Sequence, residues 1–209
     1  MTVAADPHLV RTVEALTALM GEVGVASRQK EIPYLHPHYR ALIAASPFAV
    51  LATCGPDGLD ASPRGDPPGF VVVADERTLV IPERRGNNRA DSLRNILADP
   101  RVALLFLIPG VGETLRVNGR ASITTDPALL ARLALRGALP TCAIVVAVET
   151  VFFQCARAIL RSRLWDPVDP DARRRLPSTG TILAALSNPQ IDGDRYDREL
   201  PARQQATLY

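Results

Sequence analysis

The sequence has few of the residues that build compact chemical sites. Three cysteines, three histidines and one tryptophan are spread over 209 residues, and no Cys-x-x-Cys pair occurs. This scarcity argues against a disulfide framework and a structural zinc site, and it fits a reduced, cytoplasmic compartment. A nucleophile elbow, a Walker phosphate loop and a paired-carboxylate signature are missing as well. The catalytic residues therefore stay unknown, His36 and His38 are read as part of a helix start rather than as a metal pair, and we expect any difficult chemistry to belong to a cofactor.

A surplus of one charge and a long apolar run are also missing. The 24 basic and 22 acidic residues leave a net charge of +2, which gives no argument for nucleic-acid binding. No apolar segment reaches the roughly 18 residues that span a membrane, and the N-terminus does not read as a signal peptide. Lys30 is the only lysine, so nearly all basic residues of this chain are arginines. The abundance of arginine alone therefore points to no function. The 47% hydrophobic content predicts one ordinary globular domain with additions.

The hydrophobic pattern divides the chain into three parts. It predicts a helical N-terminal extension, a strand-rich domain and a polar C-terminal surface extension, at residues 1–45, 46–167 and 168–209. The first part contains two helix starts, at Asp6-Pro7 and at His36-Pro37.

The strand-rich part contains six or more strands that follow one another mostly through short turns. Asn118-Gly119 interrupts one long strand and predicts a bulge. Asp126-Pro127 predicts a helix that Gly137 ends. Long helices do not alternate with the strands, so this order favours a small antiparallel barrel with peripheral helices over a parallel α/β sheet.

The most informative segment is IPERRGNNRADSLRNI, which begins at residue 81 and places three arginines around a glycine and two asparagines before a predicted helix. A helix start offers unpaired N–H groups and the positive end of the helix dipole. Gly86 lets the backbone turn, and Asn87 or Asn88 can cap the helix. Arginine matches phosphate oxygens in pairs. These features predict a site for a terminal phosphate monoester; a solvated basic loop is the alternative.

Two shorter segments are weaker candidates. In SPRGD, Arg64 is held stiffly between Pro63 and Gly65 at the end of a predicted strand, and a surface turn is the alternative. In RSRLW, Arg163 and Trp165 can flank a flat heteroaromatic ligand. Alternatively, the tryptophan only anchors the C-terminal part of the chain to the barrel.

Together these segments resemble a known family. The run SPRGD, IPERRGNNR-DSL-NIL-DPRV and IPG--ETLRVNGRA, with RS-LW near residue 161, resembles the FMN-binding split β-barrel proteins of the pyridoxamine 5′-phosphate oxidase superfamily. The similarity covers roughly Ser46 to Pro167 and is greatest to a bacterial branch of flavoproteins related to that oxidase. It implies an antiparallel split β-barrel, and a homodimer with FMN in a cleft between the subunits.

The resemblance also implies which residues surround the flavin ring. Ser62 and Arg64 would line the flavin and its ribityl chain. Ile81 and Pro82 would border the ring through backbone groups.

Further residues are implied at the two ends of FMN. Arg85, Asn88 and Arg89 would hold the phosphate. Arg163 and Trp165, from the other subunit, would close over the isoalloxazine ring.

The function that follows is an FMN-dependent oxidoreductase of unknown substrate, with hydride or electron transfer at flavin N5. Arg64 and Arg163 are the candidates for stabilising the reduced flavin. The segment after Trp165 departs from true pyridoxamine-phosphate oxidases, which carry basic and histidine residues for the substrate phosphate there, so oxidation of phosphopyridoxine is not expected. The alternatives are a non-catalytic flavin-binding or sensor protein, and a member of the superfamily that binds a deazaflavin or haem.

Overall fold

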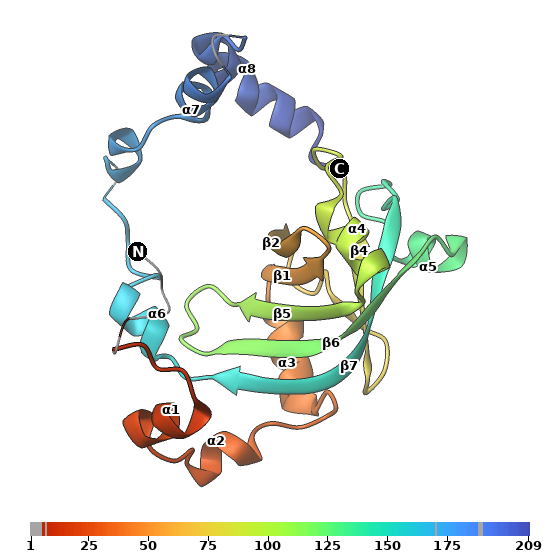
Figure 1. Ribbon diagram of the computed structural model, residues 1–209. Helices are drawn as coiled ribbons and strands as arrows, with labels where there is room; N and C mark the ends of the chain where they lie inside the picture. The colour runs from red at the N-terminus through yellow and green to blue at the C-terminus, as the bar shows by residue number, and fades with distance from the viewer. Residues whose placement is uncertain (1–5, 7, 170, 188–189) are drawn as a thin grey trace.

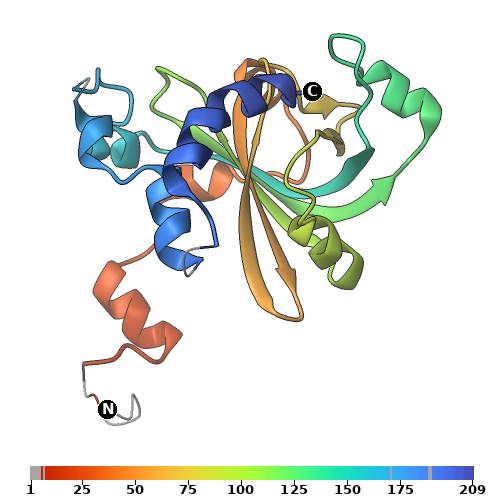
Figure 2. The same cartoon turned by 90° about the horizontal axis from the view of Figure 1, so that it is seen from above.

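The computed structural model describes residue 6 and residues 8–169, 171–187 and 190–209. Seven strands form one antiparallel sheet in the order β2-β1-β5-β6-β7-β4-β3, and the sheet curls into a split barrel with flanking helices (Figures 1 and 2). The strands are β1 (Phe48–Gly55), β2 (Gly58–Gly65), β3 (Val72–Val73), β4 (Thr78–Glu83), β5 (Arg101–Leu107), β6 (Thr114–Thr124) and β7 (Cys142–Gln154). The predicted antiparallel barrel is confirmed.

Alternating apolar side chains hold the strands together. In β1 and β5, every second residue is buried inside the barrel, including Leu51, Leu104 and Phe106, each at most 1% exposed. The predicted interruption of β6 is confirmed, because the register against β7 shifts between Asn118 and Gly119. A Cβ at Gly119 would collide with the carbonyl oxygen of Ala147, so this close approach of two backbones requires glycine.

The helices surround the barrel. They are α1 (Val13–Met20), α2 (Val25–Gln29), α3 (Pro37–Ala45), α4 (Asp91–Ala98), α5 (Pro127–Arg132), α6 (Arg157–Ser162), α7 (Thr179–Leu186) and α8 (Gly193–Ala206), with a 3₁₀ turn at Ala172–Arg175. Ile43 of α3 and Ile96 of α4 join the main core. Leu130 of α5 and Leu133, which follows the helix, pack against Val80 of β4 in a second, smaller core.

Two of the predicted helix starts are confirmed and one is wrong. His36 caps α3 by accepting a hydrogen bond from the His38 N–H at 3.3 Å, and Asp126 caps α5 in the same way. Asp6 does not begin a helix. Helix α1 starts at Val13 and Thr12 caps it, with 3.2 Å between Thr12 Oγ1 and Ala15 N.

Two helices in the second half of the chain differ from the prediction. Helix α5 stops at Arg132, before the predicted end at Gly137, because the chain turns back in a small bridge between Leu135 and Ala138. The 14-residue helix α8 has no counterpart among the predicted elements. It has no apolar stripe and contains Pro201, and none of its residues is buried, which agrees with its expected surface position.

The C-terminal part of the chain forms an arm. It leaves the barrel after α6, runs through α7 and α8, and returns so that the C-terminus lies beside the barrel (Figures 1 and 2). The returning end is fastened there, because the Tyr209 hydroxyl donates a hydrogen bond to Asp66 Oδ1 at 3.1 Å. None of the helices in the described ranges combines the length and apolar character that crossing a membrane requires.

Candidate functional site

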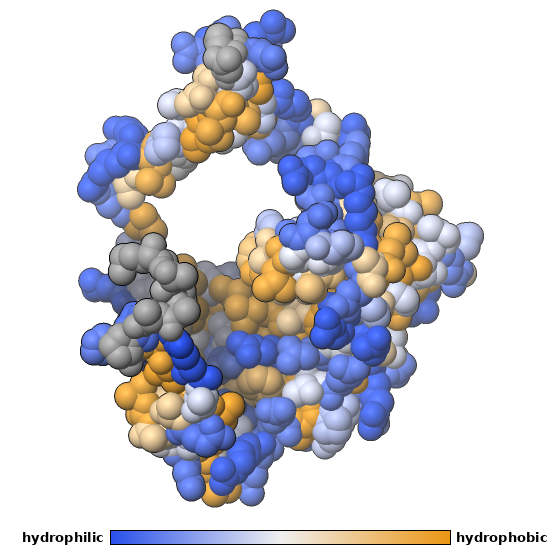
Figure 3. Space-filling model, in the orientation of Figure 1, coloured by the Kyte–Doolittle hydropathy of each residue, from blue (hydrophilic) through white to orange (hydrophobic). Residues whose placement is uncertain are grey.

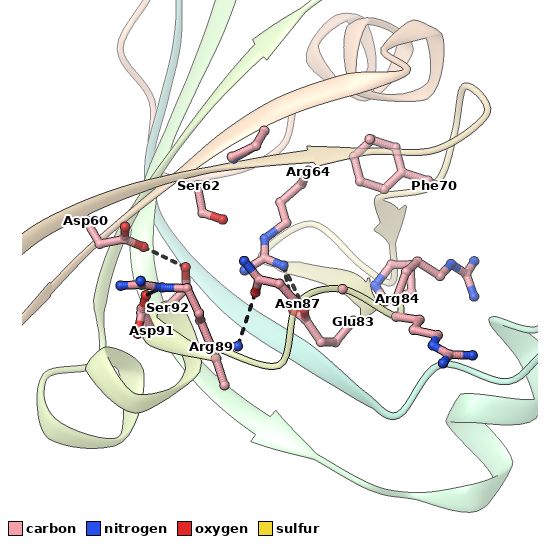
Figure 4. Close-up of a pocket in the computed structure, with 16 residues that line it drawn as sticks. Asp60, Ser62, Arg64, Phe70, Glu83, Arg84, Asn87, Arg89, Asp91 and Ser92 are labelled. Atoms are coloured by element: carbon pink, nitrogen blue, oxygen red, sulfur yellow. Dashed lines mark hydrogen bonds and ion pairs between the residues drawn. The ribbon is translucent and has the colours of Figure 1, made fainter. Parts of the chain in front are cut away.

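A cavity of about 460 Å³ lies where the barrel is split, between strand β2 and the segment that joins β4 to α4 (Figure 4). This volume falls within the range of small-molecule and cofactor sites. The residues that line the cavity are Asp60, Ser62, Pro63, Arg64, Gly65, Phe70, Pro82, Glu83, Arg84, Arg85, Gly86, Asn87, Arg89, Ala90, Asp91 and Ser92. The cavity therefore combines β2, the end of β4 and residues 84–90, which we call the arginine loop.

Strand β2 supplies one wall. Asp60, Ser62 and Arg64 are two positions apart from one another, so they project from the same face of the strand, and Figure 4 shows them side by side along it. Ser62 lies opposite the buried Leu51 of β1. The wall of the cavity is thus the continuation of the inner face of the sheet.

Two ion pairs connect the separated sides of the barrel. Arg64 Nη1 lies 2.8 Å from both carboxylate oxygens of Glu83. Arg84 Nε lies 2.7 Å from Asp66 Oδ2, and Arg84 Nη1 donates to the Leu133 carbonyl at 2.9 Å. The Asp66 side chain is only 2% exposed, so its pairing with Arg84 compensates a buried charge. These pairs hold the ends of β2 and β4 at a fixed separation.

One hydrogen-bond donor of the Arg64 guanidinium has no partner among the described residues. Its Nε is buried and has no hydrogen-bond partner within the described part of the chain. A buried N–H without a partner costs free energy and is rare in native proteins. Because Arg64 lines the cavity, this donor is suited to an acceptor atom of a ligand.

The arginine loop has an unusual backbone. Asn88 and Ala90 adopt positive φ values of 61° and 55°, a left-handed conformation that is unfavourable for alanine. Asn87 Oδ1 accepts a hydrogen bond from the Arg89 N–H at 3.1 Å, and α4 starts at Asp91 without a cap from any described side chain. The prediction that Asn87 or Asn88 caps this helix is therefore wrong. The first N–H groups of α4 stay available at the cavity wall.

The charges of the loop are partly neutralised. Arg89 Nε lies 2.7 Å from Asp91 Oδ2, and this hydrogen bond raises the pKa of the Arg89 guanidinium. Ser92 donates to Asp60 Oδ2 at 2.8 Å. Arg85 forms no ion pair among the described residues, although it lines the cavity. An anion at this end would meet Arg85, the α4 amides and an Arg89 that is shared with Asp91.

The structure brings together some of the residues assigned to the site from the sequence. Five of these residues line the cavity, namely Ser62, Arg64, Pro82, Arg85 and Arg89. Ile81 and Asn88 are neighbours of lining residues; the Ile81 side chain is fully buried in the core and Asn88 is exposed.

Arg163 and Trp165 lie in a different part of the protomer. They follow α6, which lies on the other side of the molecule from α4 (Figure 1). Trp165 Nε1 donates to the Val111 carbonyl at 2.7 Å, and Arg163 pairs with Asp166. Within one copy, neither residue belongs to the cavity, and their placement over the ring of a second copy stays a prediction.

The sequence arguments did not identify several lining residues, above all Asp60, Glu83 and Asp91. Strand alternation from Ser62 would have placed Asp60 on the cavity wall. No local sequence pattern marked Glu83 as a site residue, because its partner Arg64 is 19 positions away. The described residues contain no group of three His, Cys, Asp or Glu side chains that could hold a metal ion.

The family model for pyridoxamine 5′-phosphate oxidase matches residues 35–155, more than half of the sequence. The chain belongs to this family. The matched range contains all seven strands, the cavity and the arginine loop. It leaves out α1 and α2 as well as the C-terminal arm.

Solved structures of low sequence identity resemble part of this chain. HupZ of group A Streptococcus is 19% identical, with 57% of this chain and 94% of that chain covered and a TM-score of 0.48. A protein of the pyridoxinephosphate oxidase family from Clostridium acetobutylicum is 13% identical, with 56% and 86% covered and a TM-score of 0.45. A protein named F420 reductase is 23% identical, with 57% and 98% covered and a TM-score of 0.41. No curated protein matches the sequence.

Proposed function

We propose that this protein is a cytoplasmic FMN-dependent oxidoreductase and that FMN binds in the cavity between β2 and the arginine loop. The observation that carries the proposal is a set of hydrogen-bond donors without partners at the two ends of one cavity. Arg64 Nε stands at the β2 side, and Arg85 with the uncapped start of α4 stands at the other. An elongated ligand with acceptor atoms in its body and a phosphate at its end satisfies both.

The residues fit the two parts of FMN differently. Ser62 and Arg64 would contact the flavin and ribityl chain, and the backbone at Ile81 and Pro82 would border the ring. Glu83 fixes Arg64 through Nη1, so Arg64 Nε is oriented before the cofactor arrives and little side-chain entropy is lost on binding. The positive charge of Arg64 would also stabilise negative charge on the reduced flavin.

The phosphate would bind to the arginine loop. Arg85, Asn88 and Arg89 surround the start of α4, where backbone N–H groups and the helix dipole favour an anion. Bound FMN would supply hydride or electron transfer at N5. No side chain of the cavity is assigned as an acid or base.

The proposal includes a homodimer in which a second copy completes the site. Arg163 and Trp165 are distant from the cavity of their own protomer, so they can act only on the cavity of another copy. There they would close over the isoalloxazine ring. The apolar residues on the outer face of β5, Ala103, Leu105 and Leu107, are half-buried and suit such a contact.

The test is the chromophore of the purified protein. We expect a yellow protein that releases FMN on denaturation, identified by chromatography against FMN and FAD standards. FAD, a deazaflavin or haem as the main species would contradict the cofactor assignment, and each is distinguished by its absorption spectrum. Oxidation of NADPH or NADH in air by the loaded protein would support oxidoreductase activity. A loaded protein that accepts electrons from no donor would favour a non-catalytic flavin binder.

A further inference from the structure

The chain exposes far more surface than a compact protein of its size. Its accessible surface is 14240 Å², whereas a compact monomer of 22.6 kDa exposes about 9,500 Å². The difference of about 4,700 Å² per chain is more than the roughly 1,000–2,500 Å² that each subunit of a large obligate homodimer buries. A single copy therefore leaves enough surface exposed for a large interface with a partner.

Most of the exposed large apolar side chains lie outside the family-matched range. None of the residues of α1, all of them described, is buried. In α7, Ile182 and Leu186 are four positions apart on one side of the helix and are 44% and 79% exposed. Most of the exposed large apolar residues belong to these two end regions, namely Leu9, Val10, Val13, Leu16, Leu19, Met20, Val23, Val25, Leu160, Leu164, Val168, Leu176, Ile182, Leu186 and Leu208. Apolar surface of this extent marks an interaction site.

A third apolar surface belongs to the barrel itself. Val50 of β1 lies opposite Pro63 of β2 and Leu105 of β5, and these residues project from the outer face of the sheet because Leu51 and Leu104 project inward. Ala52, Ala61 and Ala103 form the next row in the same register. This outer face of β2, β1 and β5 carries no charged side chain in these two rows.

The arm and the barrel enclose an open passage. Figure 3 shows that the passage runs through the molecule, bordered by apolar side chains of the α7 region and by the part of the barrel that contains β1, β2 and β5. Apolar surface on two sides of a passage marks an interaction site, because covering it removes apolar area from water.

The tip of the arm is fastened to the candidate site. Asp66 accepts hydrogen bonds from both Tyr209 and Arg84. The Arg136 guanidinium lies 5.1 Å from the centre of the Tyr209 ring. A second cavity, of about 620 Å³, lies between α8 and the arginine loop, and its lining includes Arg85.

We propose that the C-terminal arm is a clasp that closes around a second copy of this chain and pins the arginine loop with its tip. The inference rests on the dimer of the proposed function and assigns the arm, which lies outside the family match, a role in it. A second copy is the occupant because it brings its own uncovered barrel face and end helices. A two-fold contact lets each apolar surface cover the other.

The clasp links assembly to the cofactor site. When the passage is filled, the arm is held closed, and Tyr209 then supports Asp66 and Arg84 next to the proposed phosphate site. By linkage, a bound cofactor strengthens the dimer as much as the dimer strengthens cofactor binding.

The first experiment measures assembly. Light scattering at tens of micromolar should give about 45 kDa for the unmodified protein, twice the chain mass of 22.6 kDa. Leu105→Arg puts a charge on the proposed contact face and should shift the mass to that of one chain. Leu139→Arg is the matched control, because Leu139 is 63% exposed in the turn before β7, and it should leave the mass unchanged. A mass of one chain for the unmodified protein would overturn the clasp.

A second readout does not depend on any variant. Cys54 lies on the outer face of β1 and is half-buried in one copy, Cys142 is buried and Cys155 is exposed. In a clasped dimer, iodoacetamide should modify Cys54 about as slowly as Cys142. Labelling of Cys54 as fast as Cys155 would contradict a covered face.

The second experiment tests the role of the arm separately from dimer formation, by measuring the rate of subunit exchange. Two populations with different fluorescent labels are mixed, and energy transfer reports the exchange of subunits. Tyr209→Ala removes the hydroxyl that binds Asp66 and the ring beneath Arg136, and it should speed exchange about tenfold or more. Tyr196→Ala is the control, because the ring of Tyr196 contacts Arg203 within α8, and it should exchange as the unmodified protein does.

The outcomes separate this inference from the proposed function. A dimer whose exchange is unaffected by Tyr209→Ala would overturn the clasp and leave the dimer and the cofactor in place. A clasped dimer that binds no FMN would support the clasp and overturn the cofactor assignment.

Discussion

Arg64 serves the fold and the candidate site at once. Its Nη1 joins β2 to β4 through Glu83, and its buried Nε has no partner in the described chain. The sequence predicted a strand here and singled out Arg64, since the flanking proline and glycine present it stiffly. The sequence did not predict the role of Glu83, because no local pattern relates two residues on separate edges of a barrel.

At the residue scale, the proposed function makes Arg89 a phosphate ligand. Arg89→Ala should weaken FMN binding about ten- to a hundredfold, because a charge-assisted hydrogen bond is lost. Riboflavin, which lacks the phosphate, should bind both proteins equally. The side chain is 74% exposed, so the fold should be unaffected. Fluorescence-quenching titrations measure all four affinities. If Arg89→Ala binds FMN as tightly as the unmodified protein, or loses riboflavin affinity to the same extent, the loop is a solvated basic turn and not a phosphate site.

Substitution of Asp91 should change FMN affinity in the opposite direction. Its carboxylate binds Arg89 at 2.7 Å and would repel a phosphate at the start of α4. Asp91→Asn should therefore tighten FMN binding about threefold, as expected for removal of one like charge at short range in a solvated site, and leave riboflavin unchanged. Asp99→Asn is the control, since Asp99 lies at the other end of α4 and hydrogen bonds from Arg101 hold its pKa at about 2. An equal effect of the two substitutions would argue for a general charge effect.

At the scale of the element, the start of α4 shows why capping could not be predicted from composition. Asn87 and Asn88 both favour helix caps, but Asn87 binds the Arg89 N–H within the loop and Asn88 takes a left-handed conformation. The helix instead begins after Ala90. The path of the loop around the cavity, and not the capping preference of its asparagines, therefore decides where the helix begins.

This backbone conformation can be tested at Ala90, whose φ is 55°. Glycine adopts that conformation without a steric cost, so Ala90→Gly should stabilise the fold by about 1 kcal/mol. Ala98→Gly makes the same change within α4 at a helical position and should destabilise by about 0.5–1 kcal/mol. Urea unfolding of both variants gives the two free energies. A destabilising Ala90→Gly would show that the left-handed conformation is not retained in solution.

The strands were predictable to a degree that the helices were not. Short apolar runs bounded by turn residues located β1, β4, β5 and β7, and Asn118-Gly119 located the bulge in β6, because these signals are local in the sequence. Helix α8 left no such signal. It packs against α7 where Gly180 and Gly193 approach each other closely, and that contact depends on tertiary structure rather than on an apolar stripe.

At the scale of the whole molecule, the sequence located the two ends of the cavity but not the arm that returns to it. Arg64 and the arginine loop were singled out by their own local patterns. Tyr209 lies 143 positions from its partner Asp66, and a contact of that separation has no local signature. The apolar surface that α1 and α7 leave exposed likewise becomes visible only when the burial of each residue is known.

The proposed function and the clasp both predict how the melting temperature depends on concentration. A ligand that binds only the folded state adds about 2.7 kcal/mol of stability at 100 times its Kd. For a chain of this size, that corresponds to a rise of roughly 5–11 °C. FMN should therefore raise the melting temperature of the cofactor-free protein by that amount, and riboflavin at the same concentration by less, because it cannot reach the arginine loop.

The protein concentration supplies the second half of this prediction. Unfolding of a dimer releases two chains, so its melting temperature rises with protein concentration, whereas that of a monomer does not. Calorimetry over a hundredfold range of protein concentration, with and without FMN, tests both couplings in one series. Tyr209→Ala should lower the melting temperature of the dimer and reduce the stabilisation by FMN, since the tip of the arm supports Asp66 and Arg84 beside the phosphate site. A melting temperature independent of protein concentration would contradict the dimer, and an FMN stabilisation that Tyr209→Ala leaves intact would show that the arm does not act on the arginine loop.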